Sequence, residues 1–206
     1  MQKIIEYLKE KYQPLAMIVY GSYADGTSGA DSDFDCLIVS RSAPVRHDMQ
    51  TVSGVPLDVF VYTPDELSEE IDPFELIQID GGVIVMDTDG LAEGLMQEVR
   101  QYIEHPPAKS RDDLLTAVAW CEKMLRRAHR GDAEGYFRWH WLLCDSLELY
   151  CDLTGRRYLG PKKSLRDMEK LDPESFALYS EALKKFTRKS LSQWISQLRT
   201  IADQRP

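Results

Sequence analysis

Three carboxylates and a glycine–serine pair in the first third of the chain have types and spacing that suit metal and phosphate chemistry. Gly21 and Ser22 are followed, after ten intervening residues, by Asp33 and Asp35, and later by Asp58. Converging carboxylates repel one another unless a cation lies between them, and oxygen-only ligands suit Mg2+ or Mn2+. Glycine leaves room for a phosphate, which a serine hydroxyl and backbone N–H groups can bind. The set predicts a site for a metal-bound polyphosphate.

Strand-like segments carry these residues. Residues 15–20 are a continuous apolar run that ends at a glycine, and residues 33–39 and 55–62 have the same character. Because alternate side chains of a strand point the same way, we expect Asp33 and Asp35 to project from one face of the second strand. Asp58 is the single acid in the middle of the third strand.

The Gly-Ser pair, the ten-residue spacer, the Asp-x-Asp and the later strand-borne Asp resemble the nucleotidyltransferase fold of the DNA polymerase beta superfamily. The size and two-part layout are similar to those of small bacterial aminoglycoside and lincosamide nucleotidyltransferases, and to minimal nucleotidyltransferases of toxin–antitoxin pairs. The likeness is strong over residues 15–62 and only architectural beyond about residue 105. It implies an α+β fold, a mixed β-sheet with flanking helices, followed by a C-terminal helical bundle.

The resemblance also implies roles for the five residues. Gly21 and Ser22 would engage the triphosphate of ATP, Asp33 and Asp35 would bind Mg2+ or Mn2+, and Asp58 would complete the metal site facing the acceptor hydroxyl. The reaction would be in-line transfer of AMP to that hydroxyl, with pyrophosphate as the leaving group.

One residue departs from the pattern of the family. Members often carry an arginine three residues after the serine, whereas this chain has Asp25, between Ala24 and Gly26. A phosphate contact must then come from elsewhere.

A proline-rich stop divides the chain. Residues 105–108 are His-Pro-Pro-Ala, which ends the helix predicted over residues 91–104. We therefore expect a catalytic domain over residues 1–105 and a helical substrate-binding domain over residues 106–206. Within the first domain, the pattern also predicts an amphipathic helix over residues 1–12, a helix from Pro64 to about Ile71, a helical turn over residues 73–79 and a buried strand over residues 83–86.

The second half reads as a bundle of four or five helices. Ser110 caps the first helix and Asp132 the next, and further helices are expected near residues 163–170 and over residues 173–203, with a break near Thr187. The expected apolar stripes are residues 114, 118, 121, 125 and 128 in the first helix, and Tyr136, His140, Leu143, Leu147 and Tyr150 in the second. Trp139, His140 and Trp141 are assigned to packing.

An acidic helix face in the second half is a candidate for function. Asp145, Glu148 and Asp152 are three and four residues apart, so they share one face. They could bind a cationic substrate, and the resemblance to aminoglycoside enzymes makes Glu148 the candidate general base for the acceptor hydroxyl. The alternative is a solvated face.

A basic, turn-rich segment follows that helix, from Gly155 to Lys163. In the superfamily that the chain resembles, a lysine of the helical half commonly reaches the triphosphate, which makes Lys162 or Lys163 the candidate. The alternative is that the arginines of this segment complement the C-terminus of the preceding helix.

The charge is distributed unevenly. The net charge is −9, but residues 1–105 hold 20 acids against six Lys and Arg, and residues 106–206 hold 14 acids against 19. Overall acidity argues against a nucleic acid as partner and suits a cationic acceptor such as an aminoglycoside. The alternative is that bulk charge serves solubility.

We expect a cytoplasmic protein. No apolar run is long enough to span a bilayer, and residues 1–12 lack the apolar segment of a signal peptide. Cysteines 36, 121, 144 and 151 have no CxxC spacing, so we expect buried thiols and no structural zinc.

Three functions remain open at this point. The first is modification of a small molecule, such as an antibiotic hydroxyl, which would confer resistance. The second is adenylylation of a partner protein, as in antitoxin nucleotidyltransferases, and the third is nucleotide binding without turnover at a degenerate site. The attached helical half favours the first. A homodimer is compatible with each.

Overall fold

The computed structural model describes residues 1–42, 45–68 and 72–204. Its contacts divide the chain into two compact units, Met1–Ile103 and Glu104–Pro206. This division falls next to the proline-rich stop. Within the described ranges, every helix is too short or too polar to span a bilayer.

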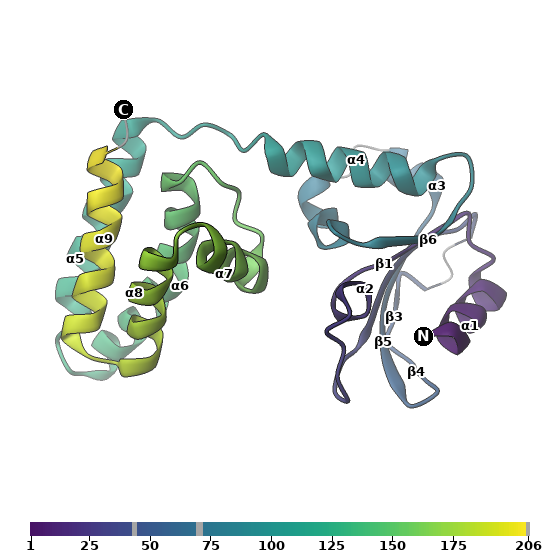
Figure 1. The fold of residues 1–206 in the computed structure, drawn as a ribbon, viewed down its shortest axis with the longest axis horizontal. Coiled ribbons are helices and arrows are strands. Elements are labelled where there is room, and N and C mark those ends of the chain that lie inside the picture. Colours follow the sequence, from purple (N-terminus) through teal and green to yellow (C-terminus); the bar gives the residue numbers. More distant parts are fainter. Residues whose placement is uncertain (43–44, 69–71, 205–206) are drawn as a thin grey trace. The chain divides into compact units, whose positions relative to one another are not determined.

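The first unit contains one main sheet and several helices (Figure 1). Its elements are α1 (Gln2–Tyr12), β1 (Ala16–Val19), α2 (Ser22–Asp25), β2 (Phe34–Val39), β3 (His47–Asp48), β4 (Thr51–Val52), β5 (Val55–Tyr62), α3 (Pro64–Ser68), the 3-10 helix η1 (Pro73–Ile79), β6 (Val83–Asp87) and α4 (Leu91–Glu104). The strand order is β3-β5-β2-β1-β6, and β4 pairs with β5. β2 and β5 run parallel and the other pairs are antiparallel, so the predicted mixed sheet is confirmed.

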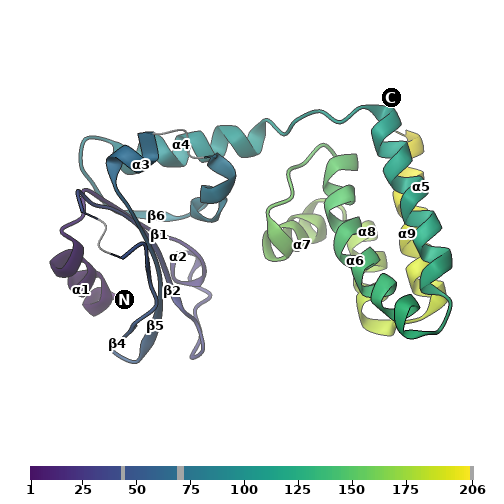
Figure 2. The ribbon, with the colours of Figure 1, turned by 180° about the vertical axis from the view of Figure 1, so that it is seen from behind.

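Each face of this sheet packs against helices (Figures 1 and 2). Because successive side chains of a strand point to opposite faces, Val19 and Cys36 pack on the α1 side. Ile18 and Leu37, one position away, pack with residues of η1 and α4 on the other side. Both faces are therefore covered by apolar contacts, which fixes the register of the strands.

Two expectations for the first unit need correction or restriction. The strand predicted over residues 83–86 exists as β6, but the prediction that it is buried is wrong, because Val83 and Ile84 are 50% and 40% exposed. β6 ends the strand order and pairs only with β1 among the described strands, so its side chains meet less of the core. The helix predicted to reach about Ile71 is observed to Ser68, and residues 69–71 lie outside the described residues.

The second unit is helical. Its helices are α5 (Arg111–Ala128), α6 (Ala133–Leu153), α7 (Gly160–Leu171), α8 (Pro173–Lys185) and α9 (Arg188–Gln204). The predicted cap at Ser110 is confirmed, since its side chain accepts a hydrogen bond from the N–H of Asp113. The fully buried Trp194 donates to Ser146 across the core of the unit, at 2.8 Å.

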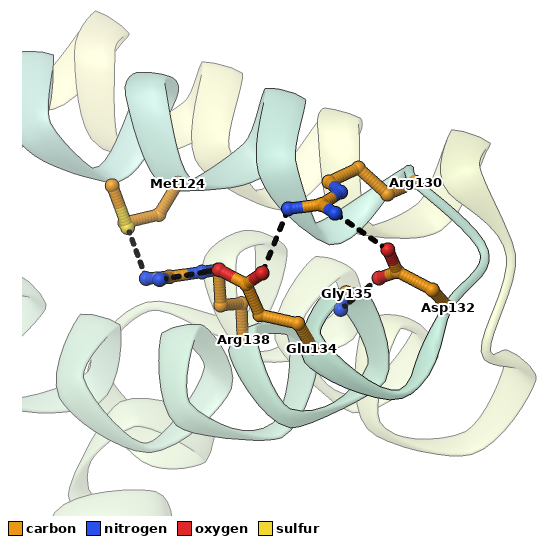
Figure 3. A network of polar contacts seen from close by, with 6 residues as sticks. All are labelled: Met124, Arg130, Asp132, Glu134, Gly135 and Arg138. Carbon is orange, nitrogen blue, oxygen red and sulfur yellow. Dashed lines mark hydrogen bonds and ion pairs between the residues drawn. The ribbon is translucent and has the colours of Figure 1, made fainter.

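Ion pairs close the turn between α5 and α6 (Figure 3). Glu134 accepts from Arg130 at 2.8 Å and from Arg138, one turn further along α6, at 2.7 Å. Asp132 caps α6 and also pairs with Arg130. Arg138 reaches back to the sulfur of Met124 on α5. These pairs are largely exposed, so they define the turn and contribute little to stability.

The predicted apolar stripe of α6 is wrong at two positions. Tyr136 is 56% exposed and His140 is also exposed, whereas Trp139 is buried. The buried face is centred about one residue away from the predicted one, because α6 packs against α5, α7 and α9. Trp141 is 40% exposed, although its ring packs edge-on against Trp120.

Three of the four cysteines are buried. Cys36, Cys121 and Cys151 are buried, as predicted, but Cys144 is exposed and the prediction for it is wrong. Cys144 lies four residues after His140 on α6, so both occupy the solvent side of that helix.

Candidate active site

Asp35 and Asp58 lie side by side on the sheet. They are register partners in the parallel pair of β2 and β5, where neighbouring strands are about 4.8 Å apart. The residues that flank them on each strand are buried on the α1 side, so both carboxylates project to the opposite face. Both residues are half-buried. Two carboxylates therefore lie next to each other on this face of the sheet.

The turn after β1 brings the backbone against one of these acids. Gly21 has φ 65° and ψ −149°, a conformation that is essentially restricted to glycine. A Cβ atom at Gly21 would lie 2.1 Å from Oδ2 of Asp35. The N–H of Tyr20 donates to the carbonyl of Asp35 at 3.1 Å, which ties β1 to β2 at this point.

Ser22 follows directly as the first residue of α2. It is half-buried, and its carbonyl accepts from the N–H of Thr27 at 3.0 Å. Among the described residues, none forms a hydrogen bond with its hydroxyl. The hydroxyl of Ser22 is therefore available to bind a phosphate oxygen.

Tyr20 borders the carboxylate pair on the same face. Only 5% of the residue is exposed, and it belongs to the apolar cluster on the η1 and α4 side. Burial raises the pKa of its hydroxyl, and the negative charges of Asp58 and Asp35 raise it further. The phenol therefore stays protonated next to the two acids.

His47 is a site residue that sequence analysis missed. Its Nε2 lies 2.5 Å from Oδ1 of Asp58, and its ring stacks on that of Phe60 with a centroid distance of 4.3 Å and an interplanar angle of 6°. His47 belongs to the two-residue strand β3, which is too short to leave a pattern in the sequence. Only its pairing with β5 brings it to Asp58.

Asp33 precedes the strand that carries Asp35. It lies immediately before Phe34, the first residue of β2, and is exposed. In the part of the chain that the structure describes, no group of three or more His, Cys, Asp or Glu side chains is arranged to hold a metal ion. The structure thus makes Asp35 and Asp58 register partners, and Asp33 lies just before β2 in the chain.

Asp25, at the position where the family often has arginine, closes the turn that follows α2. Its Oδ1 accepts from the N–H of Thr27 at 3.1 Å and from the hydroxyl of Thr27 at 2.5 Å. These contacts give this acid a local structural role.

The acidic face of α6 lies in the second unit. Burial raises the pKa of Asp145, and the charge of Glu148 raises it further, as expected for neighbouring carboxylates on one helix face. Asp152 instead forms an ion pair with Lys109 at 2.5 Å. Glu148 is exposed, and its role as a general base stays a prediction.

Lys162 and Lys163 also belong to the second unit, in the first turn of α7. Lys162 is exposed and Lys163 is half-buried. In the same segment Arg157 donates to the carbonyl of His105 at 3.2 Å. A contact of either lysine with a triphosphate stays a prediction.

Comparisons with known proteins bear on this arrangement. No curated protein matches the chain significantly. Among solved structures, the chain is similar to a nucleotidyltransferase-like protein from Exiguobacterium sibiricum 255-15, at 14% identity and a TM-score of 0.43 over 98% of this chain and 72% of that one. So distant a likeness does not bear on function. The family model described as nucleotidyltransferase domain matches residues 1–140, which include both carboxylates, the Gly21-Ser22 turn and α5. The chain therefore belongs to the nucleotidyltransferase domain family.

Proposed function

We propose that this chain transfers a nucleoside monophosphate, AMP from ATP in the first instance, to a hydroxyl of a small cationic acceptor such as an aminoglycoside or a lincosamide. The observation that carries the proposal is the pairing of Asp35 with Asp58 on adjacent parallel strands, with the backbone of Gly21 packed against Asp35. A nucleotidyltransferase domain implies a nucleotide substrate.

The donor set fits a magnesium or manganese ion. Two half-buried carboxylates on one face supply oxygen ligands and a local excess of negative charge. Mg2+ is usually bound by one or two carboxylates together with substrate phosphates, and it retains several waters. Asp35 and Asp58 would hold the ion, and Asp33 would join them when the triphosphate brings its own oxygens. When bound, the ion would neutralise phosphate charge and lower the pKa of the attacking hydroxyl.

The residues of the chain have distinct tasks in this proposal. The turn at Gly21 would let the β- and γ-phosphates approach the backbone, and the hydroxyl of Ser22 would donate to them. A bond forms between the acceptor oxygen and the α-phosphorus. The bond between the α-phosphorus and the oxygen that bridges it to the β-phosphorus breaks, and pyrophosphate leaves. Glu148 would take the proton of the acceptor hydroxyl, and Lys162 or Lys163 would contact the triphosphate.

A cationic acceptor is supported by charge. Residues 1–105, which contain the carboxylate pair, hold 20 acids against six Lys and Arg. Such an excess attracts polyamines and repels nucleic acids.

A labelling assay tests the function. The full chain is incubated with α-labelled ATP, Mg2+ and a panel of aminoglycosides and lincosamides. The products are separated by chromatography, and their masses are measured by mass spectrometry. We expect an acceptor that carries one AMP, absent with Asp35→Asn and retained with Asp65→Asn, which removes an exposed acid of α3 in the same unit.

The outcomes separate the alternatives. Label that appears only on a protein would replace the small acceptor with a protein acceptor. Nucleotide binding without labelled product on any acceptor would indicate a binding protein, and no magnesium-dependent binding of any triphosphate would overturn the proposal.

A further inference from the structure

His47 is held in one orientation beside Asp58. On β5, Asp58 and Phe60 are two residues apart and therefore lie on the same face of the sheet. The ring of His47 is stacked on Phe60 at 6°, and its Nε2 lies 2.5 Å from Oδ1 of Asp58. The aromatic contact fixes the plane of the imidazole, and the hydrogen bond fixes one oxygen of the carboxylate.

The strand that carries His47 is itself anchored. The next residue, Asp48, points to the opposite face, where it is 2% exposed and accepts from Lys11 and from the hydroxyl of Tyr12, both at 2.7 Å. Although burial alone would raise the pKa of Asp48, the hydrogen bonds from Lys11 and Tyr12 keep it below its ordinary value. β3 is thus tied to α1 on one side and to Asp58 on the other.

We infer that His47 is a positioning residue, which holds Oδ1 of Asp58 so that the other carboxylate oxygen is directed to a divalent cation shared with Asp35. The inference rests on the proposed function, because it assumes that this pair binds the ion. Ligating carboxylates are commonly oriented by hydrogen bonds from outer partners, whose loss typically costs about 10–100-fold in metal affinity.

Direct ligation by the imidazole is the competing role. Mg2+ strongly prefers oxygen ligands, whereas Mn2+ also accepts imidazole nitrogen. Removal of a positioning residue should therefore lower the affinity for both ions by a similar factor. Removal of a direct imidazole ligand should lower the affinity for Mn2+ more than that for Mg2+.

The experiment measures metal affinity without turnover. The full chain is titrated with Mn2+ followed by electron paramagnetic resonance, and with Mg2+ by competition, both alone and with α,β-methylene-ATP, which cannot release pyrophosphate. We expect His47→Leu to lower the affinity for Mn2+ and for Mg2+ by about 10–100-fold. His47→Gln keeps a terminal N–H donor at a similar reach and should stay closer to the wild type.

Two further variants make the comparison specific. Phe60→Leu removes the stacking surface but keeps the imidazole, and we expect an intermediate loss of affinity. His140→Leu removes an exposed histidine of the second unit and should bind as the wild type does. Thermal melting of each variant identifies any that fails to fold, and if His47→Leu fails, a wild-type affinity in Phe60→Leu overturns the inference.

Asp58→Asn separates the two proposals. If Asp58→Asn loses the ion and His47→Leu does not, His47 has no positioning role and the proposed function stands. If Asp58→Asn and Asp35→Asn both bind as the wild type does, the metal site of the proposed function is wrong. A loss of Mn2+ affinity in His47→Leu far larger than that of Mg2+ overturns positioning in favour of direct ligation.

Discussion

The backbone of Gly21 and the carboxylate of Asp35 leave no room for a side chain between them, since a Cβ atom at Gly21 would lie 2.1 Å from Oδ2 of Asp35. The glycine is also held at φ 65° and ψ −149°. Sterics and conformation therefore both require glycine in the turn after β1, and they couple the position of this turn to that of Asp35.

Gly21→Ala should consequently impair both stability and activity. We expect a loss of about 1–3 kcal/mol of unfolding free energy from the backbone conformation, and a further loss of activity because Asp35 must move. Urea unfolding and the labelling assay measure the two effects. Gly29→Ala is the matched control, because its φ is ordinary and its Cβ would meet nothing within 4 Å. An active, stable Gly21→Ala would contradict the observed turn.

Asp35→Asn and Asp58→Asn should abolish transfer without unfolding the protein. Metal ions stabilise the transition state by several kcal/mol, so removing a ligand should lower the rate by about a thousandfold or more. In metal-free buffer, Asp35→Asn relieves repulsion between two adjacent carboxylates, and the melting temperature of this variant should be unchanged or higher. Calorimetry in EDTA measures this. A marked fall in melting temperature would show that the acids serve the fold.

Asp48 should contribute stability that depends on pH. Its pKa is lowered in the folded state by Lys11 and Tyr12, despite burial, so the stabilisation is fully present above the unfolded pKa of about 3.9 and is lost as the pH falls through the lower folded value. Asp48→Asn should cost about 1–3 kcal/mol at pH 7. Unfolding at a series of pH values should show this difference shrinking below about pH 4. A constant difference would refute the assignment.

One thiol should react in the native protein. Cys144 is exposed, whereas burial raises the pKa of Cys121 to about 12 and that of Cys151 to about 11, and also raises that of Cys36. A disulfide reagent at mildly alkaline pH should therefore titrate one fast equivalent, and all four cysteines after unfolding. Cys144→Ser should remove the fast equivalent. A second fast thiol in the wild type would place another cysteine at the surface.

Local signals were sufficient for most elements. The strand over residues 55–62 and the helix over residues 91–104 are observed with the predicted bounds, because an apolar run and a proline stop act within a few residues. The caps at Ser110 and Asp132 are confirmed for the same reason. Burial was predicted less well. Val83 is exposed because β6 lies at the end of the strand order, and Cys144 is exposed because it lies on the side of α6 that faces away from the packed helices.

The sequence by itself determined the family motif, the strands that carry it and the alternation of side chains along them, since strand periodicity and chain order are local properties. Only the tertiary structure decided that Asp35 and Asp58 are register partners, that position 21 has no room for a side chain next to Asp35, and that His47 forms a hydrogen bond with Asp58. The reason is that these contacts cross strands: the pairing of β2 with β5 and of β3 with β5 joins residues whose proximity leaves no periodic trace along the chain.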